Sequence, residues 1–141
     1  TLRIAYGVVK IYEYNGTNPP PVTTLYGMYD RYYSFGKKEP WNLPGKWASP
    51  PTDFKMSTPI NFVSTNDIIG GNSGSSVVNK DLQVVGLIFD GNIESLPGNF
   101  IFEETKNRSV SVHTSGILEG LDKIYKADRI VKELRAGKIV Q

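Results

Sequence analysis

Apolar and polar residues alternate along several short stretches of this chain, and a two-residue period of this kind is typical of β-strands. The pattern predicts strands at residues 60–64, 76–78, 84–89 and 109–113, and a further strand over residues 1–14. Gly7 is expected to interrupt the last of these, because an isolated glycine within a strand usually marks a bulge or bend. We therefore expect a mainly β chain.

Turn residues separate these stretches. Asn15-Gly16 is a dipeptide typical of tight hairpin turns, and residues 79–81 are expected to turn the chain between two strands. Asp90-Gly91-Asn92 gives a third tight-turn signal, directly after the strand that is expected to end at Phe89.

The C-terminal part has a helical period instead. Thr114 or Ser115 would cap a helix that covers about residues 115–135 and stops at Gly137. Its apolar face would consist of Ile117, Leu121, Ile124, Val131 and Leu134. Glu119–Lys123 and Asp122–Lys126 have the i,i+4 spacing of ion pairs on the opposite face. The apolar face indicates packing against the rest of the domain, and a partner-binding helix is the functional alternative.

Between residues 19 and 59 the composition changes, because eight of the nine prolines fall in this span. The span also contains many aromatic residues, whereas disordered segments are poor in them. These rings are Tyr26, Tyr29, Tyr32, Tyr33, Phe35, Trp41 and Trp47. We therefore expect an ordered segment with buried rings and a short helix near residues 27–34.

Composition restricts the functional classes. At 141 residues, of which 39% are hydrophobic, residues 1–141 are expected to form a single domain. The net charge of +2 without a basic run argues against a nucleic-acid partner, and no apolar run has membrane-spanning length. The absence of cysteine excludes disulfides, and a single histidine argues against a histidine-based metal site, so no metal and no cofactor are predicted. Because the chain opens on a strand-like pattern without an initiator methionine, we expect it to begin inside a larger protein.

The chemically informative stretch is the glycine-rich loop over residues 66–79, which carries Ser73 and then enters a strand. A serine hydroxyl attacks a carbonyl well only where donors hold the oxyanion, and chymotrypsin-type proteases use the N–H groups of the serine and of the residue two before it. Here those donors would be Ser73 and Gly71, while Gly70, Gly71 and Gly74 would allow positive φ values. A plain Gly/Ser turn is the alternative, but the flanking strands favour a nucleophile loop.

A serine hydrolase also needs a base, and the only histidine is His113. It follows Ser73 in the chain, whereas the order in chymotrypsin-type enzymes is His, Asp, Ser. We interpret His113 as structural. The base and its orienting carboxylate are then expected in missing upstream sequence.

Several stretches together resemble the C-terminal part of the bacterial dipeptidyl-peptidases seven and eleven, which form serine peptidase family forty-six. The stretches are residues 1–7, residues 59–75 with Gly71-Asn72-Ser73-Gly74-Ser75, residues 89–95 and residues 109–113. The resemblance implies the second barrel of a chymotrypsin-like double β-barrel with a C-terminal α-helix. Ser76 departs from the family, which usually has proline there, and we expect this to affect loop stiffness more than chemistry.

The resemblance also implies a function. Ser73 would be the nucleophile, Asp90 would hold the substrate's α-ammonium, and Gly91 would select the second side chain of the substrate. Because members with arginine at the position of Gly91 prefer Asp or Glu, glycine implies an apolar preference. Asn72 replaces the aspartate that pairs with a newly cut N-terminus in many animal enzymes, so that activation route is not expected.

The implied partners are a peptide substrate with a free N-terminus and the missing N-terminal half of the same protein, without which the chain should be inactive. The family also implies the periplasm or cell surface of a Gram-negative bacterium, and it allows a homodimer of the full-length enzyme. Two other functions stay open. One is a non-catalytic chymotrypsin-like binding or scaffold domain. The other is a trypsin-like endopeptidase, since Asp67 lies six residues before Ser73.

Overall fold

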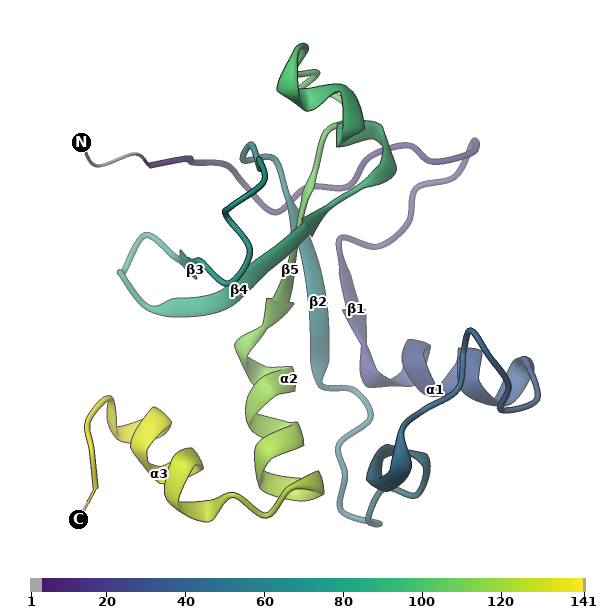
Figure 1. Ribbon diagram of the computed structural model, residues 1–141, viewed down its shortest axis with the longest axis vertical. Helices are drawn as coiled ribbons and strands as arrows, with labels where there is room; N and C mark the ends of the chain where they lie inside the picture. Colours follow the sequence, from purple (N-terminus) through teal and green to yellow (C-terminus); the bar gives the residue numbers. More distant parts are fainter. Residues whose placement is uncertain (1–3, 141) are drawn as a thin grey trace. The chain divides into compact units, whose positions relative to one another are not determined.

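The strands form one five-stranded sheet in the order β1-β2-β5-β4-β3 (Figure 1). The computed structural model describes residues 4–140. Internal contacts divide the chain into two compact units. The sheet unit contains the described residues up to Thr23 and Ile60–Thr114, and the helical unit contains Thr24–Pro59 and the residues from Ser115 onward.

The four strands predicted after residue 59 are confirmed, with one addition and one extension. The strands are β1 (Val22–Thr24), β2 (Pro59–Ser64), β3 (Ser76–Val78), β4 (Val84–Gly91) and β5 (Ser109–His113). β1 was not predicted, because three residues are too few for a recognisable period. β5 pairs antiparallel with β2 on one side and with β4 on the other, and β4 also pairs antiparallel with β3. The predicted turn joins β3 to β4, and in it Leu82 N–H donates to Asn79 O (3.0 Å).

The buried face of the sheet is partly polar. Ser111 lies opposite both Phe62 and Ile88, and all three side chains are buried. Ser64 lies opposite Ser109 on the same face, and their hydroxyl oxygens are 2.9 Å apart. Because buried hydroxyl groups need hydrogen-bond partners, this pair stabilises the point where β2 leads into the serine loop.

The predicted N-terminal strand is wrong over the residues described, and its first three residues lie outside them. Between residues 4 and 14 the backbone makes one bridge to the sheet, from Val9 to Ser64. Gly7 marks a close approach, because a Cβ there would collide with Asn66 N and Thr65 Oγ1. The Asn15-Gly16 turn is confirmed, with φ values of 49° and 72° and Tyr14 paired to Thr17.

Arg108 holds this segment to the rest of the sheet unit. Its guanidinium is buried and donates to Lys10 O (3.0 Å) and Ile11 O (2.8 Å), so a side chain takes the place of a neighbouring strand. The same group donates to the carbonyls of Glu104 (2.9 Å) and Asn107 (2.6 Å). Burial lowers the pKa of Arg108 from its ordinary value, and an arginine nevertheless remains protonated at neutral pH.

The predicted turn at Asp90-Gly91-Asn92 is wrong. β4 continues to Gly91, with Asp90 paired to Val110 and Gly91 paired to Ser109. A β-bulge leaves Phe89 unpaired between these pairs and the pair that Ile88 makes with Ser111. The strand continues because β5 offers pairing partners that a local turn signal cannot reveal. A 3₁₀ segment, η2 (Ile93–Asn99), follows β4.

In the helical unit, the predicted short helix is confirmed as α1 (Leu25–Ser34), and a 3₁₀ turn, η1 (Gly45–Ala48), follows it. Tyr29 and Tyr32 are buried, whereas Tyr26, Tyr33, Phe35 and Trp41 are exposed, so only part of the aromatic set forms a core. The Tyr29 hydroxyl donates to Trp47 O at 2.6 Å. Burial, with smaller contributions from Tyr33 and Tyr32, raises the pKa of Tyr29 to about 12.

The predicted continuous C-terminal helix is wrong. The chain forms α2 (Thr114–Glu119), a π-helical turn η3 (Gly120–Ile124) and α3 (Asp128–Ala136). The break occurs at Lys126, whose φ of 54° lies outside the helical region. α2 begins at Thr114 itself, whose hydroxyl donates to Val85 O (3.2 Å), and the expected stop at Gly137 is confirmed, with φ of 64°. Within the described part, no helix is both long and apolar enough to cross a membrane.

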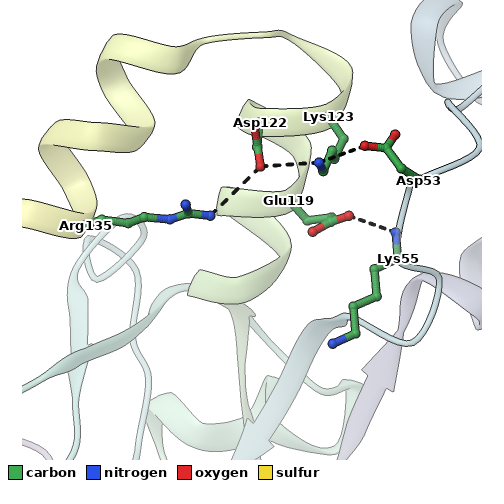
Figure 2. Close-up of polar contacts among 6 residues, drawn as sticks. All are labelled: Asp53, Lys55, Glu119, Asp122, Lys123 and Arg135. Atoms are coloured by element: carbon green, nitrogen blue, oxygen red, sulfur yellow. Dashed lines mark hydrogen bonds and ion pairs between the residues drawn. The ribbon is translucent and has the colours of Figure 1, made fainter.

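The charged residues of these helices pair differently from the prediction. Figure 2 shows Lys123 between Asp122 and Asp53, with Lys123 Nζ 2.8 Å from Asp53 Oδ2. This hydrogen bond lowers the pKa of Asp53 and raises that of Lys123. Glu119 accepts the backbone N–H of Lys55 (2.8 Å) instead of pairing with Lys123. The expected pair between Asp122 and Lys126 is lost because the helix ends before Lys126.

Candidate active site

The serine loop consists of two consecutive tight turns that β4 holds in place. In the first, Asn72 N–H donates to Ile69 O (3.2 Å) and Asn72 Oδ1 accepts from Ile69 N–H (2.9 Å). In the second, Ser75 N–H donates to Asn72 O (2.9 Å). Gly74 N–H donates to Ile88 O at 2.7 Å, and this bond joins the loop to β4. The position of the loop is therefore set by the sheet.

Two of the three glycines named in the sequence have the expected backbone. Gly71 has φ of +100° and Gly74 has φ of +88°, whereas Gly70 does not have a positive φ. A Cβ added at any of the three would meet nothing within 4 Å, so open space lies beside this backbone. The loop can thus be approached closely by a ligand.

The two amide groups of the expected oxyanion hole are unoccupied. Among the described residues, neither Gly71 N–H nor Ser73 N–H has a hydrogen-bond acceptor, although Asn72, Gly74 and Ser75 all donate their N–H groups. Backbone donors are available for a developing oxyanion only if the fold does not already use them. This pattern of used and unused N–H groups is what an oxyanion site requires.

The fold brings Ser73 next to the segment that contains Asp90. Ser73 is exposed, and its hydroxyl donates to Phe89 O at 3.3 Å, the carbonyl directly before Asp90. Phe89 is the unpaired residue of the β4 bulge, and bulges of this kind often lie next to active sites. Asp90 is exposed too, and its Oδ1 accepts the N–H of Gly91 (2.8 Å). One carboxylate oxygen is thereby held in place.

Gly91 faces two side chains that the sequence did not assign to the site. A Cβ at Gly91 would collide with Ser95 Oγ and would lie 3.2 Å from Ile68 Cγ2. Ser95 comes from η2, and Ile68 comes from the serine loop. Gly91, Ile68 and Ser95 are all partly buried, so they form one wall beside the end of β4.

Asn92 holds this wall in position. It is buried, and its Oδ1 accepts from Arg108 N–H (2.8 Å), while its Nδ2 donates to Glu94 Oε2 and Lys106 O (both 2.8 Å). Its carbonyl accepts the Ser95 hydroxyl at 2.6 Å. Asn92 therefore links η2 to the start of β5, which sets where Gly91 and Ser95 lie.

Asp67 faces a different space. It lines an open hollow of about 570 Å³, together with residues 4–8, Thr65, Phe102 and Glu104. Among the described residues, this lining includes neither Ser73 nor Gly91. Asp67 Oδ1 also accepts the N–H of Ile68 (2.9 Å). This placement does not support a carboxylate at the bottom of a trypsin-like pocket.

His113 lies at the end of β5 opposite Gly86, three residues before Phe89 along β4. Its ring packs edge-on against Phe62, with 5.7 Å between ring centroids. Burial lowers the pKa of His113, so its neutral form is favoured. The Ser73 hydroxyl donates to Phe89 O and not to His113.

Sequence reasoning missed Ile68, Asn92 and Ser95. Asn92 was assigned to a turn and Ser95 carried no signal, because its proximity to Gly91 depends on the course of η2. The four-residue separation of Ser95 from Gly91 would have been informative only if a 3₁₀ turn had been predicted there.

Comparison with known proteins gives the family. The sequence model of the family described as Peptidase S46 matches residues 1–136. A dipeptidyl-peptidase 7 from Phocaeicola vulgatus is 33% identical over 95% of this chain and 20% of its own length. An Asp/Glu-specific dipeptidyl-peptidase from Shewanella putrefaciens is 32% identical over 95% of this chain and 22% of its own length. The chain thus spans about a fifth of the length of these relatives.

A solved structure agrees with the sequence matches. The crystal structure of Porphyromonas endodontalis DPP11 in complex with the dipeptide Arg-Glu superposes with a TM-score of 0.81. It is 25% identical to this chain, and the match covers 99% of this chain and 21% of that one. The antiparallel sheet and its accompanying helices therefore have the fold of the corresponding part of that enzyme. The chain belongs to the Peptidase S46 family.

Proposed function

We propose that this chain is the nucleophile-bearing part of a serine-type dipeptidyl peptidase that removes dipeptides from the free N-terminus of peptides. The observation that supports this most is the exposed Ser73 beside two unused N–H groups, with its hydroxyl on the carbonyl that precedes Asp90. These groups are what an exopeptidase needs at one place: a nucleophile, an oxyanion site and an anion for a terminal ammonium.

The proposed reaction proceeds through an acyl-enzyme. Ser73 Oγ forms a bond to the carbonyl carbon of the second substrate residue, and its proton passes to a histidine in the part of the protein outside this chain. The N–H groups of Gly71 and Ser73 hold the oxyanion. The tetrahedral intermediate then loses the shortened peptide as an amine, which takes that proton, and water hydrolyses the ester to release the dipeptide. Without that histidine the isolated chain would be inactive.

Asp90 is proposed to set the dipeptide length of the product. Its exposed carboxylate can pair with an α-ammonium, and a desolvated ammonium without such a partner would be costly. Because Asp90 is separated from the Ser73 contact by a single peptide unit, the ammonium and the attacked carbonyl are held a short distance apart.

We propose the periplasm or the cell surface as the place of action, on the family resemblance alone.

Overall similarity does not decide which dipeptides are released, since a dipeptidyl-peptidase 7 and an Asp/Glu-specific enzyme are 33% and 32% identical to this chain. The residues around Gly91 favour an apolar second side chain. This wall contains Ile68 and the end of an apolar strand, and Gly91 brings no cation. A carboxylate that loses water there without a cationic partner is disfavoured.

The substrate preference is tested with dipeptidyl reporter substrates that end in Leu, Phe, Asp or Arg. For the full-length protein, kcat/KM is expected to be at least about 10-fold higher for Leu and Phe than for Asp, because an unpaired carboxylate keeps its desolvation penalty. A preference for Asp over Leu would overturn the apolar assignment. Preference for Arg, with cleavage of N-terminally blocked substrates, would favour a trypsin-like endopeptidase instead.

Asp90→Asn in the full-length protein is expected to lower kcat/KM by about 10- to 100-fold for substrates with a free N-terminus, the effect of one lost charge-assisted hydrogen bond. The loss should lie mainly in KM. Asp81→Asn is the matched control, because Asp81 is an exposed aspartate in the turn between β3 and β4. Unchanged kinetics for Asp90→Asn would remove Asp90 from the ammonium site.

A further inference from the structure

The space next to Gly91 is already occupied by the Ser95 hydroxyl. A Cβ at Gly91 would overlap Ser95 Oγ, whereas it would stand 3.4 Å from Ser95 Cβ, an ordinary van der Waals contact. Ile68 Cγ2 lies 3.2 Å from the same point. The hydroxyl of Ser95 is therefore the group that limits this position, and Ile68 would have to give way by only a few tenths of an ångström.

The hydroxyl is held in this place by a short hydrogen bond. Ser95 Oγ donates to Asn92 O at 2.6 Å, and Asn92 O also accepts from Ser95 N–H at 3.0 Å. Asn92 is itself buried, and its side chain is bonded to Arg108, Glu94 and Lys106. Turning the hydroxyl away from Gly91 would break its hydrogen bond to Asn92 O, so moving Ser95 Oγ costs free energy.

The direction of this hydrogen bond also sets what the hydroxyl presents to a ligand. A serine hydroxyl has one proton to donate, and Ser95 gives it to Asn92 O. The oxygen lone pairs are then what remains for a group that approaches from the side of Gly91. A carboxylate would meet an acceptor there, whereas an apolar side chain would meet only a small polar surface.

We propose that Ser95 is a specificity-determining residue of the subsite for the second substrate side chain. Its hydroxyl limits the size of that side chain and disfavours a carboxylate. It also occupies the space that a side chain at position 91 would need. This inference rests on the proposed function, in which Gly91 borders that subsite. It goes further by assigning the limiting contact to Ser95.

The first test uses Ser95→Ala in the full-length protein, with kcat/KM measured for reporter substrates that end in Leu, Phe and Asp. Removing the hydroxyl is expected to raise the ratio of Phe to Leu by about 3-fold, comparable to the burial of roughly one additional methylene group. Ser57→Ala is the matched control, because Ser57 is an exposed serine of the helical unit and its hydroxyl removal should leave all three values unchanged.

The second test is a double-mutant cycle with Gly91→Arg. Gly91→Arg alone must displace the Ser95 hydroxyl, so its gain on the Asp substrate is expected to be small. The kcat/KM of the double variant Gly91→Arg, Ser95→Ala for the Asp substrate should be about 5-fold higher than that of Gly91→Arg alone, which is the factor that one neutral hydrogen bond corresponds to. Labelling of Ser73 by a fluorophosphonate, together with the melting temperature, verifies that each variant keeps its fold and its nucleophile.

The outcomes separate the two proposals. One outcome is that Gly91→Arg alone raises kcat/KM for the Asp substrate as much as the double variant does, while Ser95→Ala leaves the Phe to Leu ratio of kcat/KM unchanged. In that case the role of Ser95 is overturned and the subsite at Gly91 stands. If folded, labelled variants at both positions leave the Phe to Leu and Asp to Leu ratios of kcat/KM unchanged, the subsite assignment itself is wrong, and the inference about Ser95 falls with it. Where Gly91→Arg does not fold, the Phe to Leu ratio of Ser95→Ala alone decides.

Discussion

Ser73→Ala in the full-length protein is expected to lower kcat/KM for dipeptidyl reporter substrates by about 10⁵-fold, because the attacking atom is lost and only binding and the oxyanion site remain. The structure supports an intact scaffold in the variant, since Ser73 is exposed and the loop is held by Gly74 N–H on Ile88 O. Turnover of the reporter substrates and fluorophosphonate labelling are the measurements, and both should be lost. The affinity of the variant for a dipeptide product, measured directly, should be kept.

Two control variants make this test specific. Ser76→Ala removes an exposed hydroxyl three residues further along the chain and should retain activity. His113→Ala should retain most activity, because His113 packs on Phe62 and the Ser73 hydroxyl donates elsewhere. If His113→Ala kept its fold and were as inactive as Ser73→Ala, the base would lie within this chain. If Ser73→Ala were fully active, a non-catalytic role for the loop would be favoured.

Arg108→Met is expected to open the N-terminal segment locally. The free energy of local opening of this segment should fall by on the order of 3–5 kcal/mol. Methionine occupies a similar volume but donates nothing, so the carbonyls of Lys10 and Ile11 would lose the guanidinium that holds this exposed segment. Hydrogen exchange of the full-length protein measures the effect. Exchange of the amides of Val8 and Thr65, which donate to Thr65 Oγ1 and Val8 O, should become faster by a factor of about 100 or more.

Arg108→Lys gives an intermediate variant, because one ammonium group cannot reach all the carbonyls that the guanidinium spans. Arg135→Met is the matched control, since Arg135 is exposed and lies 3.9 Å from Asp122 (Figure 2). Exchange that is unchanged in Arg108→Met, or equally fast in Arg135→Met, would show that the guanidinium does not hold this segment.

The serine loop could be predicted because its signal is local. Glycine at 71 and 74 is required where φ is positive, and both residues have such φ values. The strands of the sheet were predictable for a similar reason, since their two-residue period is written into consecutive residues. Where a local signal competed with pairing to a distant strand, prediction failed. Asp90-Gly91-Asn92 has the composition of a turn, yet Asp90 and Gly91 pair with β5.

The helix was mispredicted for a related reason. Its apolar period continues past residue 124, but a single residue with positive φ, Lys126, divides the helix. Asp122 and Lys126 therefore lack the regular helical turn that their spacing assumed. Lys123 pairs with Asp53, a residue 70 positions earlier, which no periodicity could indicate.

By itself the sequence determined the strands β2 to β5, the serine loop and the family, because these depend on the order and spacing of neighbouring residues. Only the tertiary structure decided what surrounds the loop. The buried guanidinium of Arg108 meets Lys10 across 98 positions, and the Ser95 hydroxyl occupies the space of a side chain at Gly91. Both contacts depend on where segments without a regular period are placed by the sheet, and that placement is a property of the folded chain and not of any local pattern.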